Sequence, residues 1–311
     1  MESSASLSIQ LPRYDRGRGL PQFKSTPAPP SHAPFPSRCY IAGMRCLTYL
    51  LLSCYSLQAQ PPAYEYTGSP LVISYTCTED DIDWAGLTCV DEPCPIYIDL
   101  THAAGQGKSI LITGNFHASA VTMYSVLLRS EDSGRTWREP IERIRGAELD
   151  AIQVYDGHTA WIAGLTLQPV AVDPFFLITD DGGATWIRVP LFEEGTEGTV
   201  LQYIFDSKDH GLALVDRGGG ELRYETYETQ TGGHTWSLHE KSAKFTKLKR
   251  VPESDWRIRA ESRVFRLEHL EEEHWSPFAS FAIRSAECRR KQLEAEPAAE
   301  VAPELKPAVK P

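Results

Sequence analysis

One short pattern occurs three times in this chain at a nearly constant interval. The three copies, which we call the first, second and third box, are SEDSGRTW at 130–137, TDDGGATW at 179–186 and TQTGGHTW at 229–236. Asp132 and Asp181 are 49 residues apart, and Asp181 and Thr231 are 50 residues apart. A pattern that recurs at one period indicates a fold built from repeated supersecondary units.

Each box lies between two stretches with strand character. The runs before the boxes are YSVLLRS (124–130), FFLITD (175–180) and LRYETYE (222–228). A short strand-like piece follows each box, such as residues 186–189. Strand runs on both sides of a Gly-containing segment predict that each box forms the turn of a β-hairpin.

The residue types of the box predict a structural role. The short side chain at the third position can accept hydrogen bonds from backbone N–H groups a few residues on, and the glycine adopts angles that other residues resist. The Thr hydroxyl can add a second such bond, and the Trp can bury a large ring between neighbouring sheets. The residues with these expected roles are Ser130, Asp132, Gly134, Thr136, Trp137, Thr179, Asp181, Gly183, Thr185, Trp186, Thr229, Thr231, Gly233, Thr235 and Trp236. No catalytic residue is predicted among them.

Strand signals continue on both sides of the boxes. Residues 152–164 and 203–215 each read as two strands joined by a tight aromatic-Asp turn, and 96–100 with 109–118 supply a matching pair. A degenerate fourth unit is expected from 245–251, 256–262 and 264–270, ending at Glu273-His274-Trp275. Because no amphipathic helix of useful length is present, the chain is predicted to be all-β, with at least four four-stranded antiparallel units between about residues 90 and 280.

The boxes resemble the Asp-box, or BNR repeat, of sialidases, sortilin-type receptors, xyloglucan-cleaving glycosidases and bacterial proteins similar to the photosystem II stability/assembly factor. The resemblance implies a β-propeller with the box between the third and fourth strands of each blade, and the aromatic-Asp turn looks most like the assembly-factor group. It covers roughly residues 90–280. Four recognisable units are fewer than the seven blades typical of that factor, and residues 61–80 are expected to supply a missing outer strand or a fifth blade.

The two ends of the chain differ in composition from its body. Residues 1–43 are rich in Pro, Ser and Arg and are predicted to be a disordered leader or a segment upstream of the true start at Met44. Residues 44–59 resemble a signal peptide, with a mature protein that begins near Gln60; a lipoprotein anchored at Cys54 is the alternative. The propeller is expected over 60–288, and 289–311 reads as a disordered tail.

Four cysteines remain after position 60, an even number that fits export. Cys89 and Cys94 flank a short turn-forming loop and are predicted to pair. That leaves Cys77, after the strand-like PLVISYTC, and Cys288, after FASFAIRSAEC. In propellers an N-terminal strand commonly completes the last blade, so Cys77 is expected to pair with Cys288 and to join the two ends; a free Cys288 in the tail is the alternative.

The net negative charge of the chain excludes some classes of binding partner. Residues 1–60 carry a balance of +4 and the remaining chain −15, within a total of −11. An acidic body repels nucleic acid and anionic membrane surfaces. No membrane-spanning segment is expected after cleavage of the signal peptide. The acidic run at 79–83 lacks the alternate oxygen spacing of a calcium loop and reads as a solvated loop. No metal and no cofactor are predicted.

Two functions remain open at this stage. The first is an exported, non-enzymatic binding or assembly module for a protein or glycan partner in the cell envelope, because no catalytic constellation is recognisable. The families imply that partners bind on loops away from the box turns, which here include 101–108, 167–174 and 193–199. The second is a divergent, sialidase-like glycoside hydrolase, which would need paired carboxylates facing a pocket. The sequence lacks the Arg-Ile-Pro motif of sialidases.

Overall fold

The structure is a computed structural model that describes residues 63–119, 121–167, 170–249 and 254–290. The chain divides at Leu57 into two units, and every described residue lies in the second unit, Gln58–Pro311. The predicted leader, the signal peptide, the start near Gln60 and the Cys54 anchor therefore lie outside the described residues. No helix within the described ranges is long and apolar enough to cross a bilayer.

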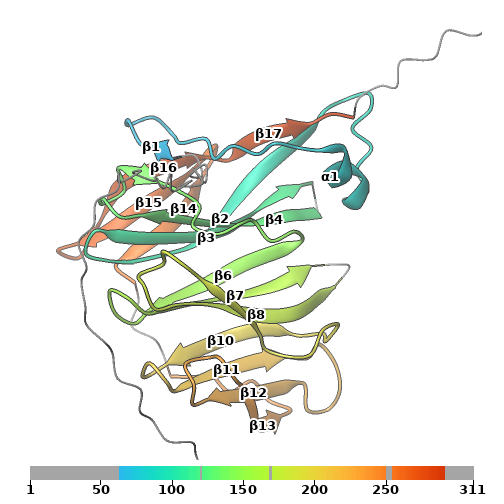
Figure 1. Cartoon of the computed structure of the whole chain (residues 1–311), viewed down its shortest axis with the longest axis vertical. Helices are drawn as coiled ribbons and strands as arrows, with labels where there is room; N and C mark the ends of the chain where they lie inside the picture. The colour runs from blue at the N-terminus through green and yellow to red at the C-terminus, as the bar shows by residue number, and fades with distance from the viewer. Residues whose placement is uncertain (1–62, 120, 168–169, 250–253, 291–311) are drawn as a thin grey trace, which may run out of the picture. The chain divides into compact units, whose positions relative to one another are not determined.

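The fold is nearly all β, as the sequence predicts, and consists of antiparallel sheets in a propeller-like arrangement (Figure 1). Blade I contains β17 (Arg284–Cys288), β2 (Cys94–Gln106), β3 (Ser109–Ala118) and β4 (Val121–Ser130), in that spatial order. Blade II contains β6 (Ala147–Val154), β7 (Ala160–Leu167), β8 (Ala171–Thr179) and β9 (Ile187–Pro190). Blade III contains β10 (Thr199–Phe205), β11 (Gly211–Asp216), β12 (Tyr224–Thr229) and β13 (Ser237–Ser242).

Blade IV differs from the predicted fourth unit. It has three strands, β14 (Trp256–Glu261), β15 (Val264–Glu271) and β16 (His274–Ala282). Residues 245–249 are not in a strand, and Glu273-His274-Trp275 lies where β15 turns into β16 rather than in a box position. The prediction of the fourth unit was therefore wrong in its first strand and in its degenerate box, because a Trp alone does not define the turn.

The segment before blade I completes two neighbouring sheets. β1 (Tyr64–Glu65) pairs with β5 (Thr136–Trp137), which follows the first box. Leu71 forms a parallel bridge with Phe281 of β16: its N–H donates to the Ser280 carbonyl at 2.9 Å, and its carbonyl accepts from Ala282 at 2.7 Å. The expected outer strand from 61–80 thus exists as a short bridge onto blade IV.

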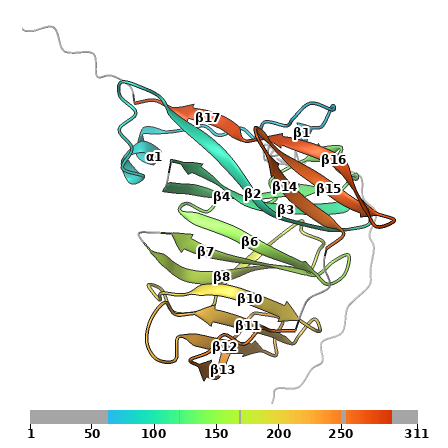
Figure 2. The same ribbon diagram turned by 180° about the vertical axis from the view of Figure 1, so that it is seen from behind.

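Hydrophobic clusters define how the blades pack. One cluster joins blade IV to blade I through residues such as Phe281 and Phe116, a second joins blades I and II, and a third joins blades II and III. Within the described part of the chain no cluster joins blade III to blade IV. Figures 1 and 2 both show blade I between blades IV and II, so blades III and IV are the two ends of the array.

Burial along the strands agrees with this order. β3 is buried almost continuously, and β7 and β8 are buried over 160–164 and 174–179, because blades I and II are covered on both faces. On blade IV, strand β14 is largely half-buried or exposed. Glu268 of blade IV is buried, and its carboxylate pairs with Arg257 at 2.6 Å and Arg259 at 3.0 Å. A charged layer on a terminal repeat keeps an end face soluble.

All three boxes form the same turn. The Ser or Thr that opens each box accepts from the N–H of its glycine: Gly134 to Ser130 at 2.8 Å, Gly183 to Thr179 at 2.9 Å and Gly233 to Thr229 at 3.0 Å. The third position accepts from the later Thr N–H at 2.8 to 2.9 Å, whether it is Asp132, Asp181 or Thr231. A hydroxyl can therefore replace the carboxylate in the third box, because the accepted bonds come from the backbone.

The tryptophans of the boxes are not equivalent. Trp137 is 1% exposed, whereas Trp186 and Trp236 are only partly buried. The Trp137 and Trp186 indole N–H groups donate to the carbonyls of Gly134 at 2.8 Å and Gly183 at 3.0 Å. The Trp236 N–H has no partner among the described residues, and its ring stacks on Phe176 at 5.0 Å. Trp186 and Trp236 nevertheless pack against the clusters that join neighbouring blades, so the boxes differ in how completely the ring is buried.

Replacing Asp181 with Ala should lower the free energy of unfolding by about 1 kcal/mol at neutral pH, the scale of lost turn hydrogen bonds. Burial alone would raise the pKa of Asp181, but bonds from Thr185, Thr179 and Ala184 outweigh it and lower the pKa from 3.8 to about 2. A depressed folded-state pKa contributes stability above the unfolded pKa, and this is lost as the pH falls through the folded pKa. Urea midpoints of both proteins should therefore converge between pH 4 and pH 2, about the window of the shift; a constant difference would contradict the assignment.

Candidate functional site: the inner groove

In blades I, II and III, the strand that comes first in the sequence contains a shift of pairing register. The register shifts between Leu100 and His102 in β2, between Leu149 and Ile152 in β6, and between Val200 and Gln202 in β10. β-Bulges redirect backbone and side chains and are frequent beside functional sites. Here they turn the carbonyls of β6 toward the neighbouring blades.

Side chains of the adjacent blades donate hydrogen bonds to these carbonyls. From blade I, the hydroxyls of Thr101 and Thr113 donate to the carbonyls of Leu149 at 3.1 Å and Asp150 at 2.6 Å. From blade III, the hydroxyl of Tyr203 contacts the Ala151 carbonyl at 2.9 Å. Three consecutive carbonyls at the β6 bulge thereby have partners on the neighbouring blades, which hold this inner strand in place.

Gln153 links blades II and III in the same way. Its amide nitrogen donates to the Phe205 carbonyl at 2.6 Å, and its amide oxygen accepts from the Phe205 N–H at 2.8 Å. The side chain is buried and satisfies both backbone groups of one residue on the neighbouring sheet.

Replacing Gln153 with Leu should lower the free energy of unfolding by about 2 kcal/mol, because two buried backbone groups lose their partner. The control is Gln202→Leu, since Gln202 accepts a single bond from the Leu248 N–H at 3.0 Å and is only partly buried. Urea unfolding of the two variants measures the difference. Equal losses would show that the two Gln153 hydrogen bonds contribute no more to the free energy of unfolding than the single bond of Gln202.

Two adjoining pockets lie against the inner edges of β6 and β10. The smaller has a volume of about 280 Å³ and the larger about 520 Å³, and both are lined by Ile152 and Gln153. The segment after β13 supplies a further wall, with residues 247–249 in the smaller pocket and Ser254 and Asp255 in the larger. We call this combined depression the inner groove.

The groove offers exposed apolar groups. Tyr155 is 43% exposed and Leu201 is 40% exposed. The Tyr155 ring lies edge-on to Trp161 at 6.1 Å, which fixes its position. An exposed aromatic ring supported from behind is well suited to contact a ligand.

Charged groups are unevenly distributed along the groove. The larger pocket is lined by Asp206 and Asp255, and the smaller by Lys247, Lys249 and Asp150. Two histidines flank these carboxylates: Asp150 lies 3.1 Å from His102, and Asp206 lies 2.6 Å from His210. The hydrogen bond to the Asp206 carboxylate is the largest of several effects that raise the pKa of His210.

One carboxyl group near the groove has a raised pKa. Glu148 lies on β6 two residues before Asp150. Burial raises its pKa, and the nearby charges of Asp150 and Asp99 add to the effect. Glu148 lines neither pocket.

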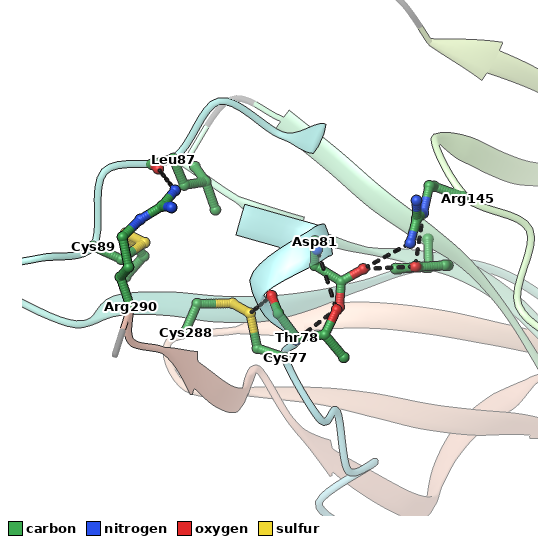
Figure 3. Close-up of a disulfide and its surroundings, with 10 residues drawn as sticks. Cys77, Thr78, Asp81, Leu87, Cys89, Arg145, Cys288 and Arg290 are labelled. Atoms are coloured by element: carbon green, nitrogen blue, oxygen red, sulfur yellow. Dashed lines mark hydrogen bonds and ion pairs between the residues drawn. A yellow bond between two sulfur atoms is a disulfide. The ribbon is translucent and has the colours of Figure 1, made fainter. Parts of the chain in front are cut away.

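The acidic run that the sequence marked as a solvated loop is instead a capped helix, α1 (Glu79–Trp84). Asp81 is buried and accepts from Thr78 at 2.8 Å, Tyr124 at 2.7 Å and Arg145 at 3.3 Å (Figure 3). The helix forms because Thr78 and Asp81 make a reciprocal capping box, a signal that the charge count obscured. Within the described ranges, no group of metal-ligating side chains could hold an ion.

Both disulfides predicted from the sequence are present. Cys77 pairs with Cys288, and Cys89 pairs with Cys94. The first bond connects the residue before the N-cap of α1 to the last residue of β17 (Figure 3). Arg290 adds an ion pair to Asp83 at 2.7 Å and a backbone bond to the Cys89 carbonyl at 3.0 Å. This region ties the two ends of the described chain together.

Among the described residues, the boxes line neither pocket of the groove, and of the three expected binding loops only 101–108 contributes to its lining, through Ala104 and Gly105. Each box contacts the first turn of its own blade, as in Gly182 N–H to the His158 carbonyl at 2.7 Å and Ser133 N–H to the Lys108 carbonyl at 3.1 Å. The loop expected at 101–108 is thus mostly strand β2, and its turn contacts a box, contrary to the expectation that it lies away from the boxes. Segments 167–174 and 193–199 do meet, through the Asp173 N–H and the Thr196 carbonyl at 3.0 Å.

Sequence reasoning missed the groove. Its described residues come from the inner strands and from 247–249 and 254–255, where the sequence predicted only framework strands and their connection. The bulges depend on contacts between blades, so no local pattern marks them.

Comparisons with known proteins add little beyond the fold. No protein-family model and no curated protein matches the chain. A GH74 xyloglucanase from Xanthomonas campestris matches 43% of the chain at 18% identity and a TM-score of 0.32; the chain spans only 19% of that enzyme. A family 117 glycoside hydrolase from the marine bacterium Zobellia galactanivorans matches 72% of the chain, and 76% of its own length, at 10% identity and a TM-score of 0.31. Similarity at this level transfers no residue or activity.

Proposed function

We propose that this chain is an exported, non-enzymatic binding or assembly module that holds a protein or glycan partner of the cell envelope in its inner groove. The observation that carries the proposal is the groove itself: about 520 Å³ and 280 Å³ of adjoining space between rigid inner strands. Ligand sites favour such concave, pre-formed positions between packed elements. Tyr155 and Leu201 supply exposed contact surface inside it.

Export is supported by the two disulfides. Disulfide pairs persist in oxidising compartments and are rare in the cytosol. The signal peptide at 44–59 remains a prediction from the sequence, and so does the alternative lipid anchor at Cys54. We therefore propose a secreted or periplasmic location.

Site-specific photo-crosslinking tests the proposal. Benzoylphenylalanine at Leu201 places the probe in the groove, and the same probe at Ile187 places it on β9, where the side chain is 58% exposed. In intact cells, adducts to a protein or a glycan are expected from Leu201 and not from Ile187. Adducts from Ile187 alone, or equally from both positions, would show that the partner binds elsewhere.

A divergent glycoside hydrolase is the second candidate, and one observation favours it. Glycoside hydrolysis uses a protonated acid beside an ionised carboxylate, and Glu148 with a raised pKa lies near Asp150. The test is release of reducing sugar from envelope polysaccharides by the wild type and by Glu148→Gln. Release that the substitution abolishes establishes the hydrolase, and no release by the wild type excludes it.

A further inference from the structure

The groove carries opposite charges at its two ends. Among the residues that the structure describes, those that line the larger pocket include Asp206 and Asp255 but no Lys, Arg or His. Those that line the smaller pocket include Lys247 and Lys249, together with Asp150, which pairs with His102. Because the two pockets share Ile152 and Gln153, a single ligand can reach both ends.

Neighbouring groups leave the larger pocket negative. His210 contacts Asp206 at 2.6 Å, but it also contacts Glu228 at 3.2 Å, so a single imidazole ring is shared between two carboxylates. His239 lies 3.3 Å from the same Glu228. Asp255, which directly precedes β14, lines the same pocket. A cation between Asp206 and Asp255 would have two carboxylates for ion pairing and the exposed ring of Tyr155 beside it.

The smaller pocket offers positive charge from two lysines. Lys247 and Lys249 are exposed, and Leu248 between them is fixed by its N–H bond to the Gln202 side chain at 3.0 Å. That anchor holds the backbone between the two lysines against blade III. An acidic group on the ligand would be attracted to this end.

We infer that the partner is a protein, and that an extended segment of it binds the groove with a basic side chain at Asp206 and Asp255 and an acidic side chain at Lys247 and Lys249. This inference rests on the proposed function, whose partner it specifies. A neutral glycan would make no use of the opposite charges, and a polyanionic one would be repelled by Asp206 and Asp255. The apolar lining between the ends, including Ile152, Ile204 and Leu201, suits the residues between the two charged side chains.

The test begins with selection of a phage-displayed library of random dodecapeptides on the full chain. Peptides that combine a basic and an acidic residue should be enriched. A fluorescein-labelled synthetic copy of the strongest one then serves as the probe in polarisation measurements. Its affinity should fall at least about tenfold in Asp206→Asn/Asp255→Asn and in Lys247→Glu/Lys249→Glu.

Charge reversal supplies the decisive comparison. Replacing the acidic residue of the peptide with Lys should weaken binding to the wild type and restore binding to Lys247→Glu/Lys249→Glu. Lys244→Glu is the matched control, because Lys244 is exposed in the same segment and lines neither pocket. Equal melting temperatures establish that all variants are folded.

The other outcomes separate this inference from the proposed function. Peptides without the charge pair that still lose affinity when Leu201 is replaced with Trp overturn the inference and leave groove binding intact. So does enrichment of no peptide together with glycan-array binding that Leu201→Trp abolishes. Ligands whose affinity is unchanged by every groove variant overturn both.

Discussion

Replacing Cys77 and Cys288 together with Ala should lower the free energy of unfolding by about 5 kcal/mol, the loop-closure estimate for a separation of this size. The two cysteines are 211 residues apart in the sequence, and Cys288 is fully buried. Their bond joins the segment that bridges to blade IV with the strand that extends blade I. Without it, both chain ends gain freedom in the unfolded state and lose a tether in the folded state.

Urea unfolding under non-reducing conditions measures this loss. The control is Cys89→Ala/Cys94→Ala, whose bond spans 5 residues and should contribute only about 2 kcal/mol by the same estimate. Equal effects of the two pairs would contradict the view that the longer bridge secures the ends of the array.

Replacing Trp137 with Ala should cost about 3–5 kcal/mol, the range for a large buried aromatic side chain. The ring packs edge-on against Phe281 of blade IV at 5.4 Å and donates to the Gly134 carbonyl at 2.8 Å. The same residue pairs with Tyr64 in the β1–β5 sheet. It therefore contributes to blade I, to blade IV and to the N-terminal segment at once.

Two further variants divide this effect into its parts. Trp137→Phe keeps most of the ring and removes the indole N–H, so it should cost about 1 kcal/mol for the hydrogen bond in addition to a smaller packing loss. Trp186→Ala should cost less than Trp137→Ala, because Trp186 is only partly buried. Thermal and urea unfolding of the three variants would refute the assignment if Trp186→Ala proved the most destabilising.

The sequence was a good guide where structure is local. The boxes, the hairpins before them and the Cys89–Cys94 pairing depend on residues a few positions apart, and these features were predictable. The Cys77–Cys288 pairing followed once the other cysteines had been assigned. The capping box of α1 was also local, but the run of acidic residues at 79–83 drew attention to charge rather than to Thr78.

Prediction failed where contacts between blades decide the outcome. Trp137 and Trp186 occupy the same position in their boxes, yet Trp137 is fully buried against Phe281 and pairs with the N-terminal segment, whereas Trp186 is only partly buried. The path of residues 245–249 is set by contacts such as Leu248 to Gln202 rather than by strand propensity. The inner groove arises from bulges whose carbonyls bond to other blades, so no single stretch of sequence specifies it.

Filling the groove tests the central claim most directly. Leu201→Trp adds bulk at an exposed position inside the groove, and Ile187→Trp adds the same bulk on the outer strand of blade II. Affinity for the partner identified by crosslinking and the melting temperature are measured on the same preparations. Binding in the groove predicts that Leu201→Trp loses most of its affinity at an unchanged melting temperature and that Ile187→Trp retains it. Full affinity of Leu201→Trp would contradict a partner site in the inner groove.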